Sequence, residues 1–237
     1  MTAWEIIQQA AREELVDEEG APVGLATLPG LSAAEIDELE EERGFRLPGE
    51  LRALLVHCSG LEGPLQEIDF TGRLAQFGFE EAFPRSVGLA GDGSGNHWIL
   101  DASPEGAPVA PVFFACHDPP VVLFQSPSLA AFLSEVFRLR RPPHESLLNA
   151  VQDELVHVWS ETPGAVTVAE AARRDPVLQE FAAALDERWR IVDLRAPEVG
   201  TGFPWFLETP IRRHGDHRIF AYARPEKRSL WARIFRR

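Results

Sequence analysis

Two short helices are predicted by the hydrophobic positions of one acidic stretch near the N-terminus. Ser32 and Glu35 match a capping box, in which each side chain satisfies a backbone N–H group at the start of a helix. Gly44 can end the first helix, and Pro48 suits the first turn of the second. The second helix is expected to end at Gly60 and to bury Leu51, Leu54, Leu55 and Cys58. This stretch therefore predicts a helical hairpin with a buried seam.

The segments before the hairpin predict one more helix and a loop. Residues 3–19 have apolar positions at Trp4, Ile7, Ala11 and Leu15, close to helical spacing. Residues 21–30 contain two prolines and two glycines and are typical of a connecting loop.

Strands are predicted after the hairpin, because segments rich in Val, Ile and Phe alternate with turn residues. These segments are residues 68–70, 77–79, 87–101 with a Gly-rich turn inside it, 109–115 and 121–125. Ser128 is expected to cap a helix at residues 129–139. Helices, then strands, then a closing helix predict an α+β fold with helices packed on an antiparallel sheet.

A domain boundary is predicted at Pro142-Pro143, because consecutive prolines end a helix and stiffen a linker. We expect one domain at residues 1–141 and a small additional α+β region at residues 142–237.

The elements expected in this second region are two long helices and three strands. Residues 145–160 place Leu148, Val151, Leu155 and Trp159 in line. Thr167 and Glu170 form a second capping box. Asp175-Pro176 opens a helix with an apolar stripe of Leu178, Phe181, Ala182, Leu185 and Trp189. Strands are expected at residues 191–194, 218–222 and 230–235.

Composition and cysteine content predict a globular protein of a reducing compartment. The 237 residues are 45% hydrophobic and 25% charged, and no apolar run approaches the ~20 residues that a bilayer span needs. The acidic start lacks the layout of a secretory signal, so we expect a cytoplasmic location. Two cysteines do not make a disulfide framework.

The net charge of −14 argues against a nucleic-acid-binding protein or a protein of anionic membranes. Residues 1–42 hold twelve Asp and Glu against one Arg, whereas residues 211–237 hold nine Arg and Lys against two acidic residues. A polyanion site in the basic segment from Arg212 to Arg237 is therefore an alternative. We favour the simpler interpretation that the two ends neutralise each other or stay solvated.

The Gly-rich segment from Gly91 to Asn96 is the most unusual local sequence of the chain. It lacks the Lys and Ser/Thr of a phosphate-binding loop and the following helix of a dinucleotide-binding turn. A calcium loop would need a distal Glu that is not at the required place. We therefore expect a structural turn that can also contact a partner.

Other candidate chemistry is weaker. A metal-dependent hydrolase would need Asp92, Asp101, His117 and Asp118 to gather around one ion. A metal site from His57-Cys58 and Cys116-His117 lacks the short spacing of zinc modules, and core packing explains the cysteines better.

Trp205 lies in a loop-like segment and is the best candidate for an exposed aromatic anchor. We expect no cofactor and no bound metal.

Several of these motifs, in their order, resemble the SUKH superfamily. They are GLSAAEIDELE at residue 30 onward, RGFRLPGELRALL, the following Ser-Gly, GDGSGNHWILD, PVFF with His117-Asp118, and the closing helix. The resemblance covers about residues 1–141. That superfamily contains the yeast cell wall assembly regulator domain and many bacterial immunity proteins. It implies a binding module without catalytic residues.

The resemblance favours an immunity protein that binds and neutralises a cognate toxin, with a regulatory scaffold as the alternative. An acidic surface would complement a basic toxin such as a nuclease. We expect two groups of partner-binding residues: Glu35, Asp37, Glu38, Glu41 and Glu42 in the first helix of the hairpin, and Asp92, Ser94, Asn96, Trp98 and Asp118 at and near the Gly-rich turn.

Overall fold

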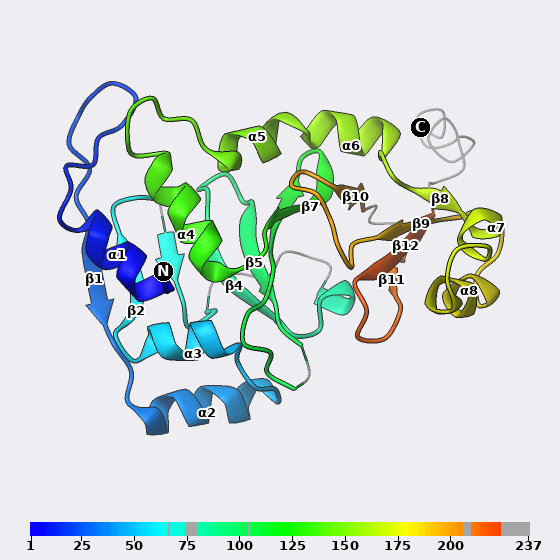
Figure 1. Cartoon of the computed structure of the whole chain (residues 1–237), viewed down its shortest axis with the longest axis horizontal. Coiled ribbons are helices and arrows are strands. Elements are labelled where there is room, and N and C mark those ends of the chain that lie inside the picture. The colour runs from blue at the N-terminus through cyan, green and yellow to red at the C-terminus, as the bar shows by residue number, and fades with distance from the viewer. Residues whose placement is uncertain (66, 74–79, 104, 206–209, 224–237) are drawn as a thin grey trace, which may run out of the picture.

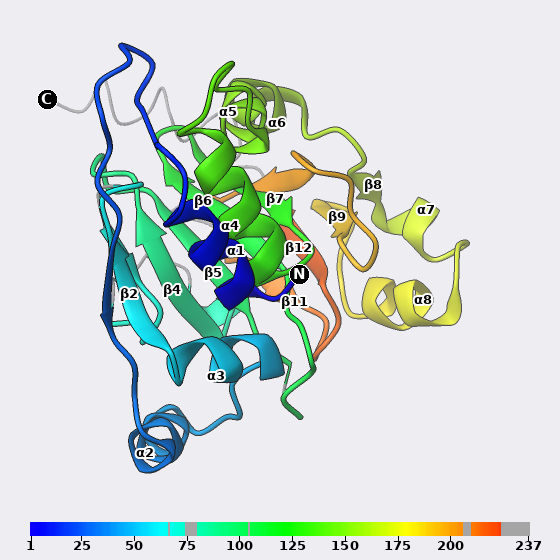
Figure 2. The same cartoon turned by 60° about the vertical axis from the view of Figure 1, so that its left-hand side comes forward.

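Two antiparallel sheets organise the fold (Figure 1). The computed structural model describes the chain except residues 66, 74–79, 104, 206–209 and 224–237. In these described residues, one sheet has eight strands and the other has four. Helices cover one face of the larger sheet (Figure 2), and the smaller sheet packs on part of its other face. The predicted α+β class with helices on an antiparallel sheet is confirmed.

The larger sheet is built almost entirely from the first half of the chain. Its strands, in spatial order, are β1 (Ala26–Pro29), β2 (Cys58–Glu62), β3 (Glu67–Asp69), β4 (Ser86–Gly91), β5 (His97–Asp101), β6 (Val112–His117), β7 (Pro120–Ser126) and β10 (Gly202–Pro204). The helices around it are α1 (Ala3–Ala10), α2 (Ala33–Arg43), α3 (Gly49–Leu55), α4 (Leu129–Arg138), α5 (Leu147–Asp153) and α6 (Leu155–Glu161), and a 3-10 turn, η1 (Glu80–Ala82), precedes β4.

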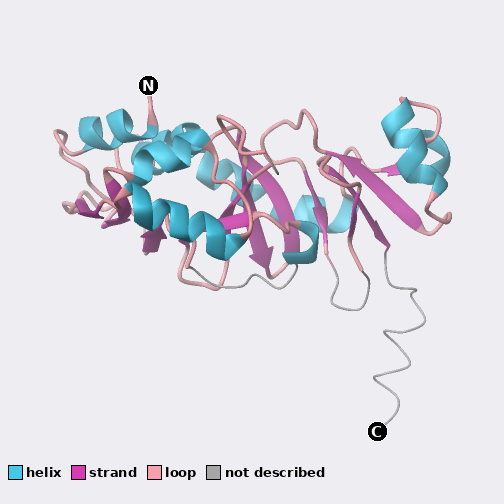
Figure 3. Ribbon diagram, turned by 90° about the horizontal axis from the view of Figure 1, so that it is seen from below, coloured by secondary structure: helices cyan, strands magenta, loops and turns pink. Residues whose placement is uncertain are grey.

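The smaller sheet and its two helices come from the C-terminal part. Its strands, in spatial order, are β11 (Arg212–Arg213), β12 (Ile219–Ala223), β9 (Trp189–Asp193) and β8 (Val166–Thr167). The helices α7 (Val168–Ala171) and α8 (Pro176–Ala183) cover its outer face. They lie at the end of the molecule opposite the N-terminal helices (Figure 3).

The helical hairpin forms with the predicted caps. Ser32 and Glu35 make the capping box, and Gly44 ends α2 in the left-handed conformation with φ 70°. The capping box at Thr167 is also confirmed. The second helix of the hairpin ends earlier than predicted, at Leu55. Cys58 instead begins β2, because antiparallel pairing with β1 and β3 takes up the backbone groups of this segment.

The N-terminal helix is also shorter than predicted. It ends at Ala10 rather than at residue 19, and Val16 pairs with Pro22 in an isolated β-bridge. Val16 also donates its N–H to the carbonyl of Arg140, a bond that a helix would not allow. Part of the predicted loop at residues 21–30 becomes β1, whose side chains are all exposed at the edge of the sheet.

Alternate residues of the central strands enter two different cores. Trp98 and Leu100 in β5 face the helices, whereas Ile99 faces the smaller sheet. The same division runs through β6 and β7, so both faces of these strands are buried. This explains their nearly continuous Val and Phe content. The strands predicted at residues 87–101, 109–115 and 121–125 are confirmed with small shifts of their ends.

The C-terminal helices depart from the predicted pattern at two places. Residues 145–160 form two helices, α5 and α6, that meet at Glu154. Because of this break Val158 is buried and Trp159 is 43% exposed, so the prediction of a core position for Trp159 is wrong. Trp189 lies in β9 rather than on the stripe of α8, where Leu178, Phe181 and Ala182 are buried as predicted. The strands predicted at residues 77–79 and 230–235 lie outside the described residues.

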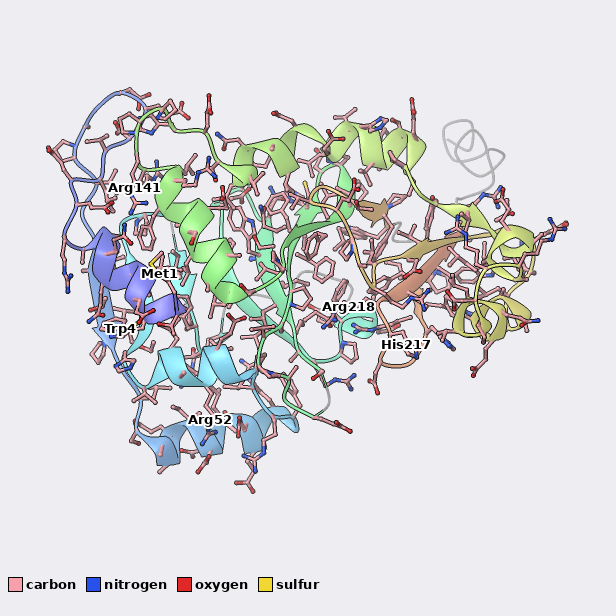
Figure 4. The ribbon with its side chains drawn as sticks, viewed as in Figure 1. Met1, Trp4, Arg52, Arg141, His217 and Arg218 are labelled. Atoms are coloured by element: carbon pink, nitrogen blue, oxygen red, sulfur yellow. The ribbon has the colours of Figure 1, made fainter. Side chains whose placement is uncertain are left out.

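A buried carboxylate joins the two sheets. Asp101, at the end of β5, is 0% exposed. Its oxygens accept hydrogen bonds from Arg213 at 2.8 and 3.0 Å and from Arg218 Nε at 2.8 Å. Arg213 also lies over the rings of Phe83 and Phe220, and Arg218 points from the start of β12 toward the larger sheet (Figure 4). Two of the basic residues near the C-terminus are therefore directed toward one carboxylate inside the molecule.

The domain boundary at Pro142-Pro143 stays a prediction. Both prolines are exposed, and β10 from the C-terminal part pairs with β7 from the N-terminal part. We expect trypsin to cut between Arg140 and Arg141 and the two fragments to stay together in gel filtration, because that pairing does not need the connection. Resistance of this site under conditions that cut other arginines would contradict the boundary.

We expect Asp101→Asn to lower the free energy of unfolding by about 3–5 kcal/mol, because the guanidinium groups of Arg213 and Arg218 would lose the buried carboxylate that is their counter-charge. Urea denaturation measures this change. Asp153→Asn is the matched control, since Asp153 is exposed and should change stability by less than about 0.5 kcal/mol. Equal stability of the two variants would show that the buried ion cluster does not stabilise the fold.

Candidate protein-binding surfaces

The turn between β4 and β5 is held by its own side chains. Asp92 Oδ1 accepts hydrogen bonds from the N–H groups of Ser94 and Asn96 at 2.8 and 3.1 Å. Asn96 Nδ2 donates to Asp92 Oδ2 at 2.6 Å. Gly93 and Gly95 have φ angles of 78° and 89°, which only glycine adopts without strain. The structural turn predicted here is confirmed, and Ser94 is exposed at its tip.

The turn is tied to the neighbouring β6–β7 turn through one residue, Asn96. Its Oδ1 atom accepts a hydrogen bond from His117 N at 3.1 Å and lies 2.8 Å from His117 Nδ1. Since Asn96 Nδ2 already donates to Asp92, the oxygen faces His117, and Nδ1 of His117 carries the proton. Asp118 follows His117, and both residues are exposed. Two turns joined by residues that are 21 positions apart thus form one polar surface, which we call the twin-turn surface (Asp92, Ser94, Asn96, His117 and Asp118).

The acidic helix α2 is the second predicted surface. Glu38, Glu41 and Glu42 are exposed along it. Asp37 forms an ion pair with Arg52 of α3 at 2.6 Å, so Arg52 connects the two helices (Figure 4).

Glu35 in α2 belongs to the helix cap. Hydrogen bonds from Ser32 lower its pKa. This cap therefore stabilises the helix above the ordinary carboxyl pKa, and the stabilisation is lost as pH falls through the lowered value.

A comparison with family models identifies the family of the segment that contains both surfaces. Residues 30–135 match the model of the SMI1 / KNR4 family (SUKH-1). Residues 30–135 form a SUKH-1 domain. Domains of this family are protein-interaction modules. Searches of curated proteins and of solved structures give no match.

The SUKH-1 domain runs from α2 into α4, a shorter span than residues 1–141. α1, β1, β10 and the smaller sheet lie outside it. The twin-turn surface and the acidic helix both lie inside it.

The two predicted surfaces lie at opposite ends of the strands of the SUKH-1 domain. Gly91, beside the β4–β5 turn, pairs with Glu67 at the start of β3. Arg43 at the end of α2 donates to the carbonyls of Thr71 and Gly72, beyond the other end of β3. A partner that binds one surface therefore need not contact the other.

Two tryptophans do not have the exposed positions that were expected. Trp98 is 2% exposed, and its indole N–H donates to Gln125 in the core at 3.1 Å. Its ring is not accessible to a partner, so that prediction is corrected. Trp205 is 8% exposed and donates to the carbonyl of Cys116, so it is not an exposed anchor. Both indoles are buried because each N–H finds an acceptor between packed layers.

Sequence reasoning missed the roles of His117 in the twin-turn surface and of Glu40 on the buried face of α2. His117 was considered only as a metal ligand, and nothing in its sequence context points to Asn96, which is 21 positions away. Glu40 could have been found, since it follows Ile36 by four positions and so shares the buried face of α2. It is 4% exposed and accepts hydrogen bonds from Arg46 and from the N–H of Leu47. Burial raises the pKa of Glu40, but these donors and Arg52 lower it overall.

The four residues that a metal-dependent hydrolase would need do not gather around one point. Asp101 is held by Arg213 and Arg218 on the face of the sheet toward the second core, at the other end of β5 from the twin-turn surface. In the described ranges, no group of three His, Cys, Asp or Glu side chains is arranged to hold a metal ion. Both thiols are buried; burial raises the pKa of Cys58 to about 12 and also raises that of Cys116. Cys58 is part of the core, as predicted.

We expect Asn96→Ala to release the imidazole of His117 from its fixed tautomer. Imidazole nitrogen chemical shifts should show the Nδ1–H form in the native protein and a shift toward the commoner Nε2–H form in the variant. Ser94→Ala is the control, because only the backbone N–H of Ser94 takes part in the turn. A predominantly Nε2–H imidazole in the native protein would contradict the assigned hydrogen bond.

Proposed function

We propose that this protein is a non-catalytic binding module that acts in the cytoplasm as an immunity protein and neutralises a cognate, basic toxin domain such as a nuclease. The observation that carries the proposal is a SUKH-1 domain with an exposed acidic helix and a polar twin-turn surface. Neither surface needs a cofactor to bind a protein. No helix within the described residues is long and apolar enough to span a membrane.

The charge distribution supports a basic partner. Two of the arginines near the C-terminus are used inside the fold by Asp101, whereas Glu38, Glu41 and Glu42 face solvent on α2. An acidic surface on one partner and a basic surface on the other accelerate association through long-range attraction.

A regulatory scaffold is the second candidate. The observation that favours it is the C-terminal part, which adds β10 and a second sheet to the SUKH-1 domain. A minimal immunity protein does not need this addition, and a scaffold could use it for a further partner.

The test of the immunity proposal is co-expression with the toxin encoded by the neighbouring gene. The proposal expects survival of the cells and a complex that can be isolated by pull-down. Equal cell death with and without this protein, together with the absence of a complex, would refute it. The absence of a toxin gene beside the gene for this protein would favour the scaffold instead.

We expect replacement of Glu38, Glu41 and Glu42 by Lys to slow association with the toxin by about tenfold at low salt. The difference should shrink as salt screens the charges. Stopped-flow association rates at several salt concentrations measure this effect. The matched control replaces Glu145, Glu180 and Glu187, which are exposed outside the SUKH-1 domain. If both triple variants slow association equally, net charge rather than α2 steers the partner.

A further inference from the structure

A groove beside the N-terminal helix lies away from both surfaces described above. It has a volume of about 580 Å³ and is formed by the start of α1, the outer side of α3, the segment before β6 and the start of α4. Met1, Trp4, Glu50, Ala53, His57 and Val109 line it. Figure 4 shows Met1 and Trp4 on the side of the molecule away from the smaller sheet.

The walls of this groove combine exposed apolar groups with an aromatic stack. Met1 is 80% exposed and Val109 is 51% exposed. The rings of Trp4 and His57 are stacked, with their centroids 4.9 Å apart and an angle of 7° between their planes. The stack fixes the indole of Trp4 as a flat wall. Flat aromatic walls bind apolar groups and also attract cations through the π-electrons of the ring.

A carboxylate without a counter-charge lies in the same groove. Glu50 is partly buried, and its oxygens accept hydrogen bonds from the N–H groups of Leu129 at 2.8 Å, Ala130 at 3.3 Å and Ala110 at 3.4 Å. Within the described part of the chain, Glu50 forms no ion pair. Burial raises its pKa, and these backbone donors lower it only in part.

The backbone donors do not use the full capacity of the Glu50 carboxylate. Two carboxylate oxygens can accept about four hydrogen bonds, and three are present. A partly buried carboxylate is stabilised further by a cation that reaches it. Glu5, also in the lining, is exposed and acidic. The groove therefore combines the carboxylate of Glu50 with apolar and aromatic walls.

We propose that this groove binds an arginine side chain of a protein partner, with the guanidinium group at Glu50 and the aliphatic stem against Trp4 and Val109. Arginine fits better than lysine, because a planar guanidinium can stack on an indole and donate to a carboxylate at the same time. An anionic group would be repelled by Glu50 and Glu5. The inference rests on the proposed function in that it assigns the arginine to the basic partner.

The test uses a blocked peptide, acetyl-Gly-Leu-Arg-Gly-amide, and the full chain. Binding is followed by amide chemical shifts in two-dimensional NMR. We expect saturable shifts at Ala53, Val109 and Ala130, and at least fivefold weaker binding of the same peptide with citrulline, which has the shape of arginine without its charge. Equal binding of the two peptides, or shifts elsewhere, would overturn the proposal.

Two variants locate the site. Val109→Lys adds a cation to the groove wall at an exposed position and should weaken peptide binding by roughly fivefold or more. Val199→Lys is the matched control, because Val199 is exposed in the C-terminal part and its replacement should leave binding unchanged. Glu50→Gln should abolish the preference for arginine over citrulline, and a thermal melt shows whether this variant is folded. A preference for arginine that survives in folded Glu50→Gln would refute the role of Glu50.

The outcome is independent of the toxin experiment. Peptide binding without a toxin complex would refute the immunity proposal and leave the groove assignment in place. A toxin complex with no peptide binding would refute only the groove.

Discussion

The buried contact of Asp101 with Arg213 and Arg218 is the interaction on which the joining of the two sheets depends. A carboxylate that is 0% exposed is costly unless cations and hydrogen bonds compensate for lost water, and here two guanidinium groups do so. Both come from the β11–β12 hairpin. The two sheets are therefore held together by this ion cluster and by the shared aromatic core around Phe113 and Phe220.

This arrangement determines which surfaces of the SUKH-1 domain remain open. In β5, β6 and β7 both faces are buried, one under helices and one under the C-terminal part. A partner can reach β5, β6 and β7 at their ends, because their faces are covered. The twin-turn surface and the acidic helix lie at opposite strand ends. A partner of ordinary size could use either, and the groove at Trp4 offers a third position on the helical side.

The charged residues that are exposed in the folded protein are not those that the sequence alone suggests. The basic segment from Arg212 to Arg237 offered a polyanion site as an alternative. In it, Arg213 and Arg218 are directed inward to Asp101, and residues 224–237 lie outside the described residues. The acidic segment divides similarly. Glu40 is buried between Arg46 and Arg52, and Asp37 pairs with Arg52, whereas Glu38, Glu41 and Glu42 face solvent. On α2, the negative charge available to a partner therefore lies at Glu38, Glu41 and Glu42.

Local chemistry in the sequence was enough to predict the caps at Ser32 and Thr167, the turn at Gly93 and the helix after Ser128, because each depends on residues a few positions apart. The α+β class followed from the order of the predicted helices and strands along the chain. The end of the second hairpin helix, the strand β1 and the exposure of Trp159 depended on pairing and packing with distant segments. The same holds for the candidate surfaces. From the sequence, Asp92, Asn96 and Asp118 were predicted to contact a partner. Only the tertiary structure brought Asn96 to His117, buried Trp98 and Trp205, and paired Asp101 across 112 positions with Arg213. Such long-range contacts leave no periodic pattern in the sequence. Their free energy comes from the desolvation and packing of residues that lie far apart along the chain.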